Sequence, residues 1–259
     1  MAKGFKDRNN HRNTSYTNNN LIIGRNPVTE ALKSGRNIDK IMVSSDEGSM
    51  KVLIAKARER GIPVMRAERS ALDRLANGQP HQGVAAYVSS YEYSSVEDIL
   101  ALAEKKGEDP FIIILDGIED PHNLGAIIRT ADCAGAHGII IPKRYSAGLT
   151  DTVAKASAGA IEYVPVAKVA NIAQTIETLK EKGIWVYACD MDGELYTKQN
   201  MKGRLALVIG SEGFGISRLV KEKCDFTVSI PMRGHVNSLN ASNAACTVMY
   251  EVRRQRDLG

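Results

Sequence analysis

The hydrophobic positions in the second part of the chain form short continuous runs, separated by segments with helical spacing. The runs that we predict as strands are FIIILD, GIIIP, YVPV, IWVYACD, LALVIG and FTVSIP. Between them we predict helices over LGAIIRTADCAGA, DTVAKASAGA, IAQTIETLKEKG and GISRLVKEKC, with a last helix from about Ser238 to Arg256. Continuous apolar strands that alternate with helices predict an α/β fold with a parallel sheet covered on both faces.

The first third of the chain shows a smaller unit of the same kind. We predict strands over IDKIMVSS, IPVMRAE and GVAAYVSS, and helices over LIIGRNPVTEALKSG, MKVLIAKARERG and SALDRLANG, the last capped by Ser70. We therefore divide the chain into a disordered, weakly basic tail at 1–20, a small α/β unit at 21–90, a linker at 91–108 and a larger α/β unit at 109–259.

Composition is that of a soluble globular protein. The 259 residues are 43% hydrophobic and 25% charged, and no apolar run approaches the ~18 residues of a membrane-spanning helix. The first 20 residues lack the apolar segment of a secretory signal, so we expect a cytoplasmic protein. No C-x-x-C pair is present, which predicts reduced core thiols and neither a metal site nor disulfides. The four cysteines are Cys133, Cys189, Cys224 and Cys246.

Charge is distributed unevenly along the chain. The net charge is +4, yet residues 1–90 carry 15 lysines and arginines against 8 aspartates and glutamates. Residues 91–259 carry 19 against 22. This asymmetry favours a first unit that meets phosphate backbones and a second unit with a different task.

Polar residues gather after three of the predicted strands, at the edge where a parallel α/β sheet places its ligand site. After FIIILD, Asn123 stands at a predicted helix start, where its simplest role is an N-cap. Arg129 follows six residues later in an otherwise apolar run, so we expect its guanidinium to be largely buried. Such a group serves the site or belongs to a structural ion pair, and we favour the site.

Glycines follow the strand LALVIG. Gly210, Gly213 and Gly215 give the spacing G-x-x-G-x-G, which is neither the dinucleotide fingerprint nor a phosphate-binding loop. They permit tight turns and the close approach of a ligand. Glu212 stands between them as a charge at a helix start or as a carboxylate of the site, and the spacing does not decide between the two.

The strand FTVSIP leads into a segment rich in asparagine and serine. A single such residue suffices to cap the last helix, and Ser238 is a candidate. Ser238 and Asn240 flank Leu239 in a run that costs helix stability, which indicates contacts with a ligand. Three more polar residues fit a site or a packing role equally well: Asn237, Ser242 and Asn243.

The segments NLGAIIRT, LVIGSEGFGIS and SIPMRGHVNSLNASNAA together resemble the three motifs of the SpoU, or TrmH, family of RNA ribose 2′-O-methyltransferases. They stand in the family's order within residues 109–259. Residues 21–90 are similar, by a looser pattern, to the RNA-binding substrate domain of RlmB-type members, which modify a guanosine in large-subunit ribosomal RNA. The resemblance implies S-adenosylmethionine as cofactor, rRNA or tRNA as substrate, and a homodimer with sites near the subunit interface. It also implies a deep C-terminal trefoil knot, which chain-threading statistics alone would not predict.

The family's motif residues map onto this chain position by position. The resemblance implies catalytic roles for Asn123, Arg129, Glu212, Ser238 and Asn240. It implies that the backbone around four further residues holds the cofactor: Gly210, Ile230, Met232 and Leu239. The chain departs from the family at Asn243, where relatives often carry a small apolar residue.

Methyl transfer to a ribose hydroxyl needs in-line placement of the 2′-oxygen and removal of its proton. Arg129 has been proposed as the general base in this family, but guanidinium groups stay protonated in proteins. We therefore expect Arg129 mainly to position and stabilise the developing oxyanion or a phosphate, with base action left open. Glu212 would orient Arg129 or the nearby backbone. The other polar residues would fix the ribose and the cofactor's methionine tail.

Two other classes of protein stay in view. A non-catalytic RNA-binding or ribosome-assembly protein would keep the basic first unit but would not need the five polar site residues. A nicotinamide-dependent oxidoreductase would suit the α/β pattern, but its glycine fingerprint and the acidic residue about 20 positions later are missing. We rank RNA 2′-O-methyl transfer first, with tRNA as the alternative to ribosomal RNA.

Overall fold

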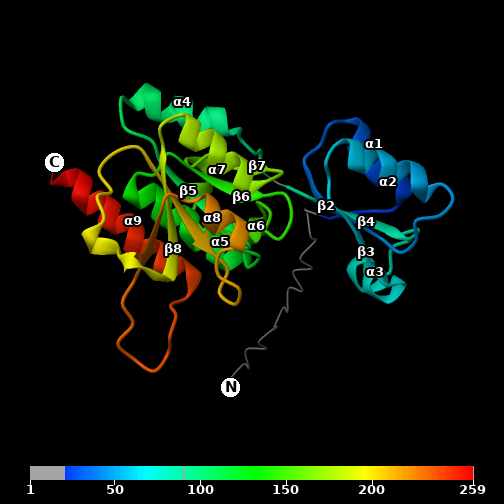
Figure 1. The fold of residues 1–259 in the computed structure, drawn as a ribbon. Helices are drawn as coiled ribbons and strands as arrows, with labels where there is room; N and C mark the ends of the chain where they lie inside the picture. The colour runs from blue at the N-terminus through cyan, green and yellow to red at the C-terminus, as the bar shows by residue number, and fades with distance from the viewer. Residues whose placement is uncertain (1–20, 90, 259) are drawn as a thin grey trace, which may run out of the picture.

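The computed structural model describes residues 21–89 and 91–258, which form two α/β units (Figure 1). The predicted tail at 1–20 lies outside the described residues. The first unit is a four-stranded sheet in the order β1-β4-β2-β3, in which β2 and β3 run parallel and the other neighbours antiparallel. Its elements are β1 (Leu21–Ile23), α1 (Arg25–Lys33), β2 (Ile38–Val43), α2 (Met50–Glu59), β3 (Val64–Arg66), α3 (Arg69–Ala76) and β4 (Val84–Val88).

Two predictions about where helices begin in the first unit are wrong. The segment LIIGRNPVTEALKSG is not one helix, because Leu21–Ile23 pairs with β4 as an edge strand. The break falls at Gly24, whose φ of 95° is a backbone conformation that glycine adopts easily. Ser70 does not cap α3, since the helix begins one residue earlier and Glu68 holds the N-cap position.

The second unit is a sheet of six parallel strands in the order β10-β8-β9-β5-β6-β7. The predicted α/β fold with a parallel sheet is therefore confirmed. Its elements are α4 (Val96–Lys106), β5 (Phe111–Asp116), α5 (Pro121–Ala134), β6 (Gly138–Pro142), α6 (Asp151–Ala156), the 3-10 helix η1 (Ala160–Glu162), β7 (Val166–Val169), α7 (Ile172–Glu181), β8 (Trp185–Leu195), the 3-10 helix η2 (Tyr196–Lys198), β9 (Leu205–Gly210), α8 (Arg218–Lys223), β10 (Phe226–Ser229) and α9 (Ala241–Asp257).

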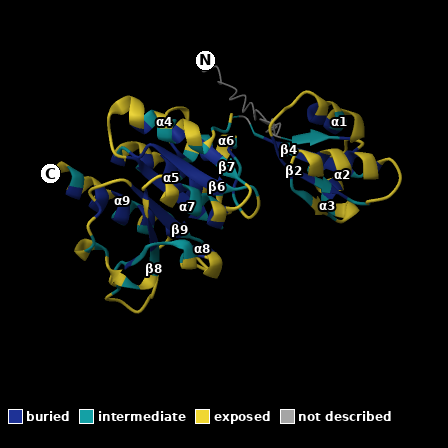
Figure 2. Ribbon diagram, turned by 45° about the horizontal axis from the view of Figure 1, so that its top comes forward, coloured by how far each residue is buried: buried dark blue, intermediate teal, exposed yellow. Residues whose placement is uncertain are grey.

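Helices cover both faces of this sheet, and its central strands are buried (Figure 2). In β5, the side chains of Phe111, Ile113 and Leu115 join one buried cluster with residues of α5, α6 and α9. Ile112 and Ile114 join a second cluster with residues of α4, α7 and α8. Successive side chains of a strand point to opposite faces, so burial on both faces explains the continuous apolar run.

The segment between the two sheets contains α4, which packs against β6 and β7 of the second sheet. Ser95 and Asp98 form a capping box at its start. Ile99 is fully buried, and a Cβ on Gly138 would overlap its side chain. The segment therefore adds a helix to the core of the second unit.

Two further predictions for the second unit need correction. The strand predicted over YVPV starts later, at Val166, because Tyr163 ends η1 and Val164 is buried in the turn that follows. The four cysteines are free, but Cys133 is exposed rather than in the core. An apolar residue buried in a turn and one buried in a strand give the same local pattern.

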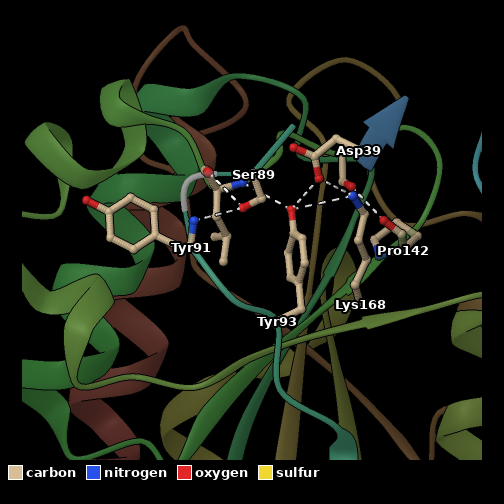
Figure 3. A network of polar contacts seen from close by, with 8 residues as sticks. Asp39, Ser89, Tyr91, Tyr93, Pro142 and Lys168 are labelled. Atoms are coloured by element: carbon tan, nitrogen blue, oxygen red, sulfur yellow. Dashed lines mark hydrogen bonds and ion pairs between the residues drawn. The ribbon is translucent and has the colours of Figure 1, made fainter. Parts of the chain in front are cut away.

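A polar cluster joins the two units (Figure 3). The Asp39 carboxylate of β2 accepts a hydrogen bond from the Tyr93 hydroxyl at 2.6 Å and pairs with Lys168 Nζ of β7 at 2.6 Å. The Tyr93 hydroxyl also accepts from the Leu149 N–H at 3.1 Å. Burial and the nearby Asp39 carboxylate raise the pKa of Tyr93 well above its usual value, so the phenol stays a neutral donor. We call Asp39, Tyr93 and Lys168 the junction cluster.

Candidate active site

A pocket of about 350 Å³ opens between the loop after β9 and the long segment after β10. Both segments leave the sheet at its carboxyl edge, where parallel α/β sheets bind ligands. The side chains of Ile209 and Val228, from the two strands, line its inner part. Nine residues singled out from the sequence also line it: Gly210, Glu212, Gly213, Gly215, Ile230, Met232, Asn237, Ser238 and Leu239.

The loop after β9 is folded tightly on itself. Ser211 and Gly215 exchange two backbone hydrogen bonds, of 3.0 and 2.9 Å. A Cβ on Gly210 would overlap the Gly215 carbonyl carbon, so no larger residue fits there without moving the loop. The predicted tight turn is present, and it holds Glu212 at the mouth of the pocket.

Three polar side chains, from the glycine loop and from the starts of α5 and α9, meet beside the pocket. Asn123 Nδ2 donates to Glu212 Oε1 at 3.1 Å, and Asn240 Nδ2 donates to Asn123 Oδ1 at 2.9 Å. Asn240 Nδ2 also bonds to Glu212 Oε1, which accepts from the Ala241 N–H at 3.4 Å as well. We call Asn123, Glu212 and Asn240 the pocket cluster. It ties together the starts of α5 and α9 and the glycine loop.

Asn240, and not Ser238, caps the last helix. Its Oδ1 accepts from the backbone N–H groups of Ser242 at 3.0 Å and Asn243 at 3.3 Å, and α9 begins at Ala241. Ser238 lies before the helix, exposed and lining the pocket. Asn240 therefore serves two purposes, since its amide nitrogen holds the pocket cluster while its oxygen caps α9.

Asn123 is not an N-cap either. The helix α5 starts at Pro121, and Asp120 caps it by accepting from the His122 N–H at 3.0 Å. Proline suits the first helical turn, because its missing N–H is not needed there. Asn123 thus lies within the first turn, 8% exposed, with its amide pointed at the pocket cluster.

Arg129 differs most from its prediction. Its side chain is exposed, and it has no hydrogen-bond or ion-pair partner among residues 21–89 and 91–258. It does not line the pocket of its own chain. Glu212 contacts the two asparagines and the Ala241 N–H instead of orienting Arg129. The structural ion pair is therefore absent from the described chain, and the fold leaves Arg129 free on the surface of α5.

Residues that the sequence did not single out complete the pocket. Cys189, Asp190 and Met191 of β8 line one wall, and Phe214 of the glycine loop lies at the mouth, 98% exposed. Burial raises the pKa of the Cys189 thiol to about 12, so it stays neutral. Asp190 is paired with Lys221 at 2.7 Å. The segment IWVYACD also ends at the carboxyl edge of the sheet, so the sequence could have predicted that its last residues line the pocket.

The pocket fits S-adenosylmethionine in size and charge. Its volume lies near the lower end of the ~300–1,000 Å³ found for small-molecule sites. Ile230 and Leu239 offer apolar surface for a flat ring. Glu212 has no ion-pair partner in the described chain, so its negative charge favours a ligand that carries a cation, as a sulfonium does.

The described part of the chain contains neither a candidate metal site nor a membrane-spanning helix. No group of three or more histidines, cysteines, aspartates or glutamates there could hold a metal ion. No helix within 21–89 and 91–258 is both long and apolar enough to cross a bilayer.

Comparison with known proteins gives two family matches that together span most of the chain. Residues 110–250 match the SpoU rRNA Methylase family, and residues 21–94 match the RNA 2′-O ribose methyltransferase substrate binding family. The Bacillus subtilis (strain 168) protein YacO, named as a TrmH family tRNA/rRNA methyltransferase, is 53% identical over 240 residues, which cover 91% of this chain and 96% of YacO.

Solved structures show the same architecture. The SpoU methyltransferase AviRb from Streptomyces viridochromogenes, in complex with AdoMet, aligns with a TM-score of 0.60 and 26% identity over 92% of this chain and 91% of AviRb. An AdoMet-bound rRNA methyltransferase from Sinorhizobium meliloti aligns with a TM-score of 0.56 and 26% identity over 90% of this chain and 86% of that one. With the pocket and its three motif loops, these matches show that the chain belongs to the SpoU, or TrmH, family of S-adenosylmethionine-dependent RNA methyltransferases.

Proposed function

We propose that this enzyme methylates the 2′-hydroxyl of one ribose in structured RNA, and that its substrate is a guanosine of large-subunit ribosomal RNA. The observation that supports the chemistry best is the pocket cluster. It brings Asn123, Glu212 and Asn240, which are far apart in the sequence, to one edge of a pocket of cofactor size. Such substrates would place the enzyme in the cytoplasm.

The pocket walls would hold the cofactor. In this proposal Gly210, Ile230, Met232 and Leu239 surround its adenosine part, with the glycine loop close enough for backbone contacts. When bound, S-adenosylmethionine supplies an electrophilic methyl group on a sulfonium. Ile230 and Leu239 would keep water away from the ring, and the Glu212 charge would favour the cationic end.

The polar residues at the pocket edge would divide into two groups. Asn123, Glu212 and Asn240 satisfy one another, so their first task is to fix the shape of the three loops. Ser238 and Asn237 are exposed, line the pocket and make no hydrogen bond within residues 21–89 and 91–258, so they are available to the ribose or the methionine tail. Preorganised loops of this kind cost no rearrangement when substrate arrives.

Arg129 would act on the site of a second copy of the chain in a homodimer. It is exposed and unpaired, whereas the pocket of its own chain has no arginine in its lining. Large apolar side chains near the pocket are also exposed, namely Phe214 at 98% and Val236 at 72%, and a partner subunit would cover them. Arg129 would then position the RNA and stabilise the oxyanion formed as the 2′-hydroxyl loses its proton. The segment 230–240 would belong to a deep trefoil knot.

We further propose that residues 21–90 select the RNA and that 91–108, whose helix α4 packs on the second sheet, connects them to the methyltransferase domain at 109–259. An open groove of about 550 Å³ on the first unit is lined by Arg25 and Lys56. Lys56 has no ion-pair partner in the described part of the chain, so it is available to a phosphate. The basic balance of the first third supports this assignment.

The deciding experiment maps 2′-O-methylation across ribosomal and transfer RNA from cells with and without the gene. Loss of one guanosine methylation in large-subunit RNA is the expected result. Loss of a methylation in tRNA instead would identify tRNA as the substrate, an alternative that agrees with the words tRNA/rRNA in the name of YacO. No change at any site would contradict the proposed function.

A further inference from the structure

The loop between β6 and α6 presents an exposed tyrosine beside two cations. Tyr145 is 75% exposed, and Arg144, next to it, is exposed as well. Neither Arg144 nor Lys143 has an ion-pair partner among the described residues. An aromatic ring flanked by uncompensated positive charge is typical of surfaces that bind single-stranded nucleic acid.

This loop is held firmly in spite of its exposure. Ser146 Oγ donates to the Pro142 carbonyl at 2.6 Å, and the Ala147 N–H donates to the Ile118 carbonyl at 2.8 Å. Tyr145 has φ of 58°, a left-handed conformation that costs a non-glycine residue roughly 1–2 kcal/mol. The ring is therefore displayed on a fixed backbone, and a preorganised ring loses little entropy when a base stacks on it.

The loop lies between the pocket and the first unit. On one side, Ala147 bonds to Ile118, and a Cβ on the adjacent Gly117 would lie 3.4 Å from Ser211 of the glycine loop. On the other side, the Leu149 carbonyl accepts from Ser89 Oγ at 3.0 Å, and Gly148 packs on the Asp39 carboxylate. An RNA that contacts both the first unit and the pocket would pass over this loop.

Positive charge continues from the loop into the crevice between the units. This crevice, about 190 Å³, is lined by Arg60, Lys143 and Lys168, with Asp39 as the acidic group among its lining residues. Asp39 neutralises Lys168. Within 21–89 and 91–258 the Arg60 guanidinium donates only to the Leu32 and Arg36 carbonyls, at 2.6 and 3.2 Å, and thus keeps its full charge. Two uncompensated cations remain, Arg60 and Lys143, which suit phosphate groups.

We propose that the loop 143–145 is a second RNA-binding element, in which the Tyr145 ring stacks on an unpaired base near the target nucleotide. Lys143 and Arg144 contact the adjoining phosphates, together with Arg60 across the crevice. The inference rests on the proposed function, because it takes structured RNA as the ligand. It adds a base-reading contact outside both the pocket and the basic groove of the first unit.

The test compares RNA affinity among full-length variants. The probes are ribosomal and transfer RNA purified from a strain that lacks the gene, and filter binding gives the dissociation constants. Tyr145→Ala should weaken binding of the substrate RNA about tenfold, the scale of one lost base–aromatic stack, and Tyr145→Phe should stay within about twofold. Arg144→Ala should lower the salt dependence of binding by about one unit of slope.

Tyr163→Ala is the matched control, since Tyr163 is 76% exposed but precedes β7 at the opposite, amino edge of the sheet. It should bind RNA as the unaltered protein does, and every variant should keep its affinity for S-adenosylmethionine by calorimetry. Unchanged RNA binding by Tyr145→Ala, or an equal loss in Tyr163→Ala, would overturn the inference and leave the proposed function standing. An unaltered protein that methylates neither RNA would overturn both.

Discussion

The pocket cluster and the junction cluster both tie distant parts of the chain together around one carboxylate, but they treat its charge differently. Asp39 is 9% exposed and is neutralised by Lys168 at 2.6 Å. Glu212 is exposed and receives only amide and backbone N–H donors, with no cation among the described residues. The charges of Asp39 and Lys168 cancel within the junction cluster, whereas the pocket cluster keeps the negative charge of Glu212.

This difference separates a structural joint from a ligand site. A buried carboxylate without its cation would be costly, so Asp39 and Lys168 act as a unit that fixes the first sheet against β7. Glu212 retains its negative charge at the edge of a pocket, where a cationic ligand can neutralise this charge. The comparison predicts that changes at the two clusters affect different measurements.

Replacement of Glu212 should give the largest effect. Glu212→Ala removes the shared acceptor of Asn123, Asn240 and the Ala241 N–H, and it removes the charge. Hydrogen bonds to a charged group contribute ~1.5–3 kcal/mol each, so affinity for S-adenosylmethionine should fall about 10³-fold by calorimetry. Glu212→Gln keeps a hydrogen-bond acceptor at this position, so its affinity for S-adenosylmethionine should fall less than that of Glu212→Ala. Equal affinity of the alanine variant and the unaltered protein would show that the cluster does not shape the pocket.

Arg129 tests whether a second copy of the chain contributes a residue to the active site. Arg129→Ala should reduce turnover of methyl transfer by about 10², the scale of losing a preorganised charge at an oxyanion. The melting temperature of the Arg129→Ala variant should change little, because the Arg129 side chain is exposed and unpaired within the described chain.

Mixing the two inactive variants sharpens this test. If Arg129 acts across the interface, re-associated Arg129→Ala and Glu212→Ala chains form mixed dimers with one intact site, and about a quarter of full activity returns. If Arg129 acts within its own chain, no mixed dimer has an intact site. Absence of any recovery would therefore assign Arg129 to its own subunit.

At the junction cluster the expected effect is on stability. Lys168→Met leaves the Asp39 carboxylate without its cation and should cost about 2 kcal/mol, or ~4–8 °C in melting temperature. The cost falls below that of a fully buried pair, since the two side chains keep 12% and 10% exposure. S-adenosylmethionine affinity should not change. Asp39→Asn combined with Lys168→Met should recover most of the loss, and a double variant as unstable as the single one would contradict the pairing.

The smallest effect is expected at His137, which belongs to neither cluster. Its ring is fully buried, accepts the Phe111 N–H at Nδ1 at 3.0 Å, and contacts Glu108 through Nε2 at 3.1 Å. Burial, with Lys106 nearby, lowers the pKa of His137 below its ordinary 6.5. Below pH 6.5 the unfolded chain therefore binds more protons than the folded chain. The free energy of unfolding keeps its full value above pH 6.5 and decreases as the pH falls below it.

One proton can lower the free energy of unfolding by at most about 1.4 kcal/mol per pH unit in this range. Denaturant unfolding between pH 5.5 and 8 measures it, with His137→Asn as the control, because asparagine can accept the Phe111 N–H without titrating. The variant should lack this part of the pH dependence. An unchanged pH profile would assign the acid sensitivity to another group.

The sequence predicted the elements of the second unit where local patterns decide them. FIIILD and LALVIG are strands over the residues expected, because side chains buried on both faces of a sheet leave a continuous apolar run. The order of the three motifs also indicated which strand ends carry the chemistry. Helix starts were less certain. Asn123, Ser238 and Ser70 all have capping side chains, but Asp120, Asn240 and Glu68 hold those positions.

Only the tertiary structure decided how the polar residues are used. Asn123, Glu212 and Asn240 are 89 and 28 residues apart along the chain, and nothing local links them. The exposure of Arg129 depends on which side of α5 faces the sheet, and an apolar neighbourhood in the sequence predicted burial wrongly. The sequence by itself determined most strands and helices and the three motif loops, since these follow from periodicity and backbone preference, but it misplaced several element starts. Which charges are neutralised and which stay open to a ligand follows from contacts between segments that only folding brings together.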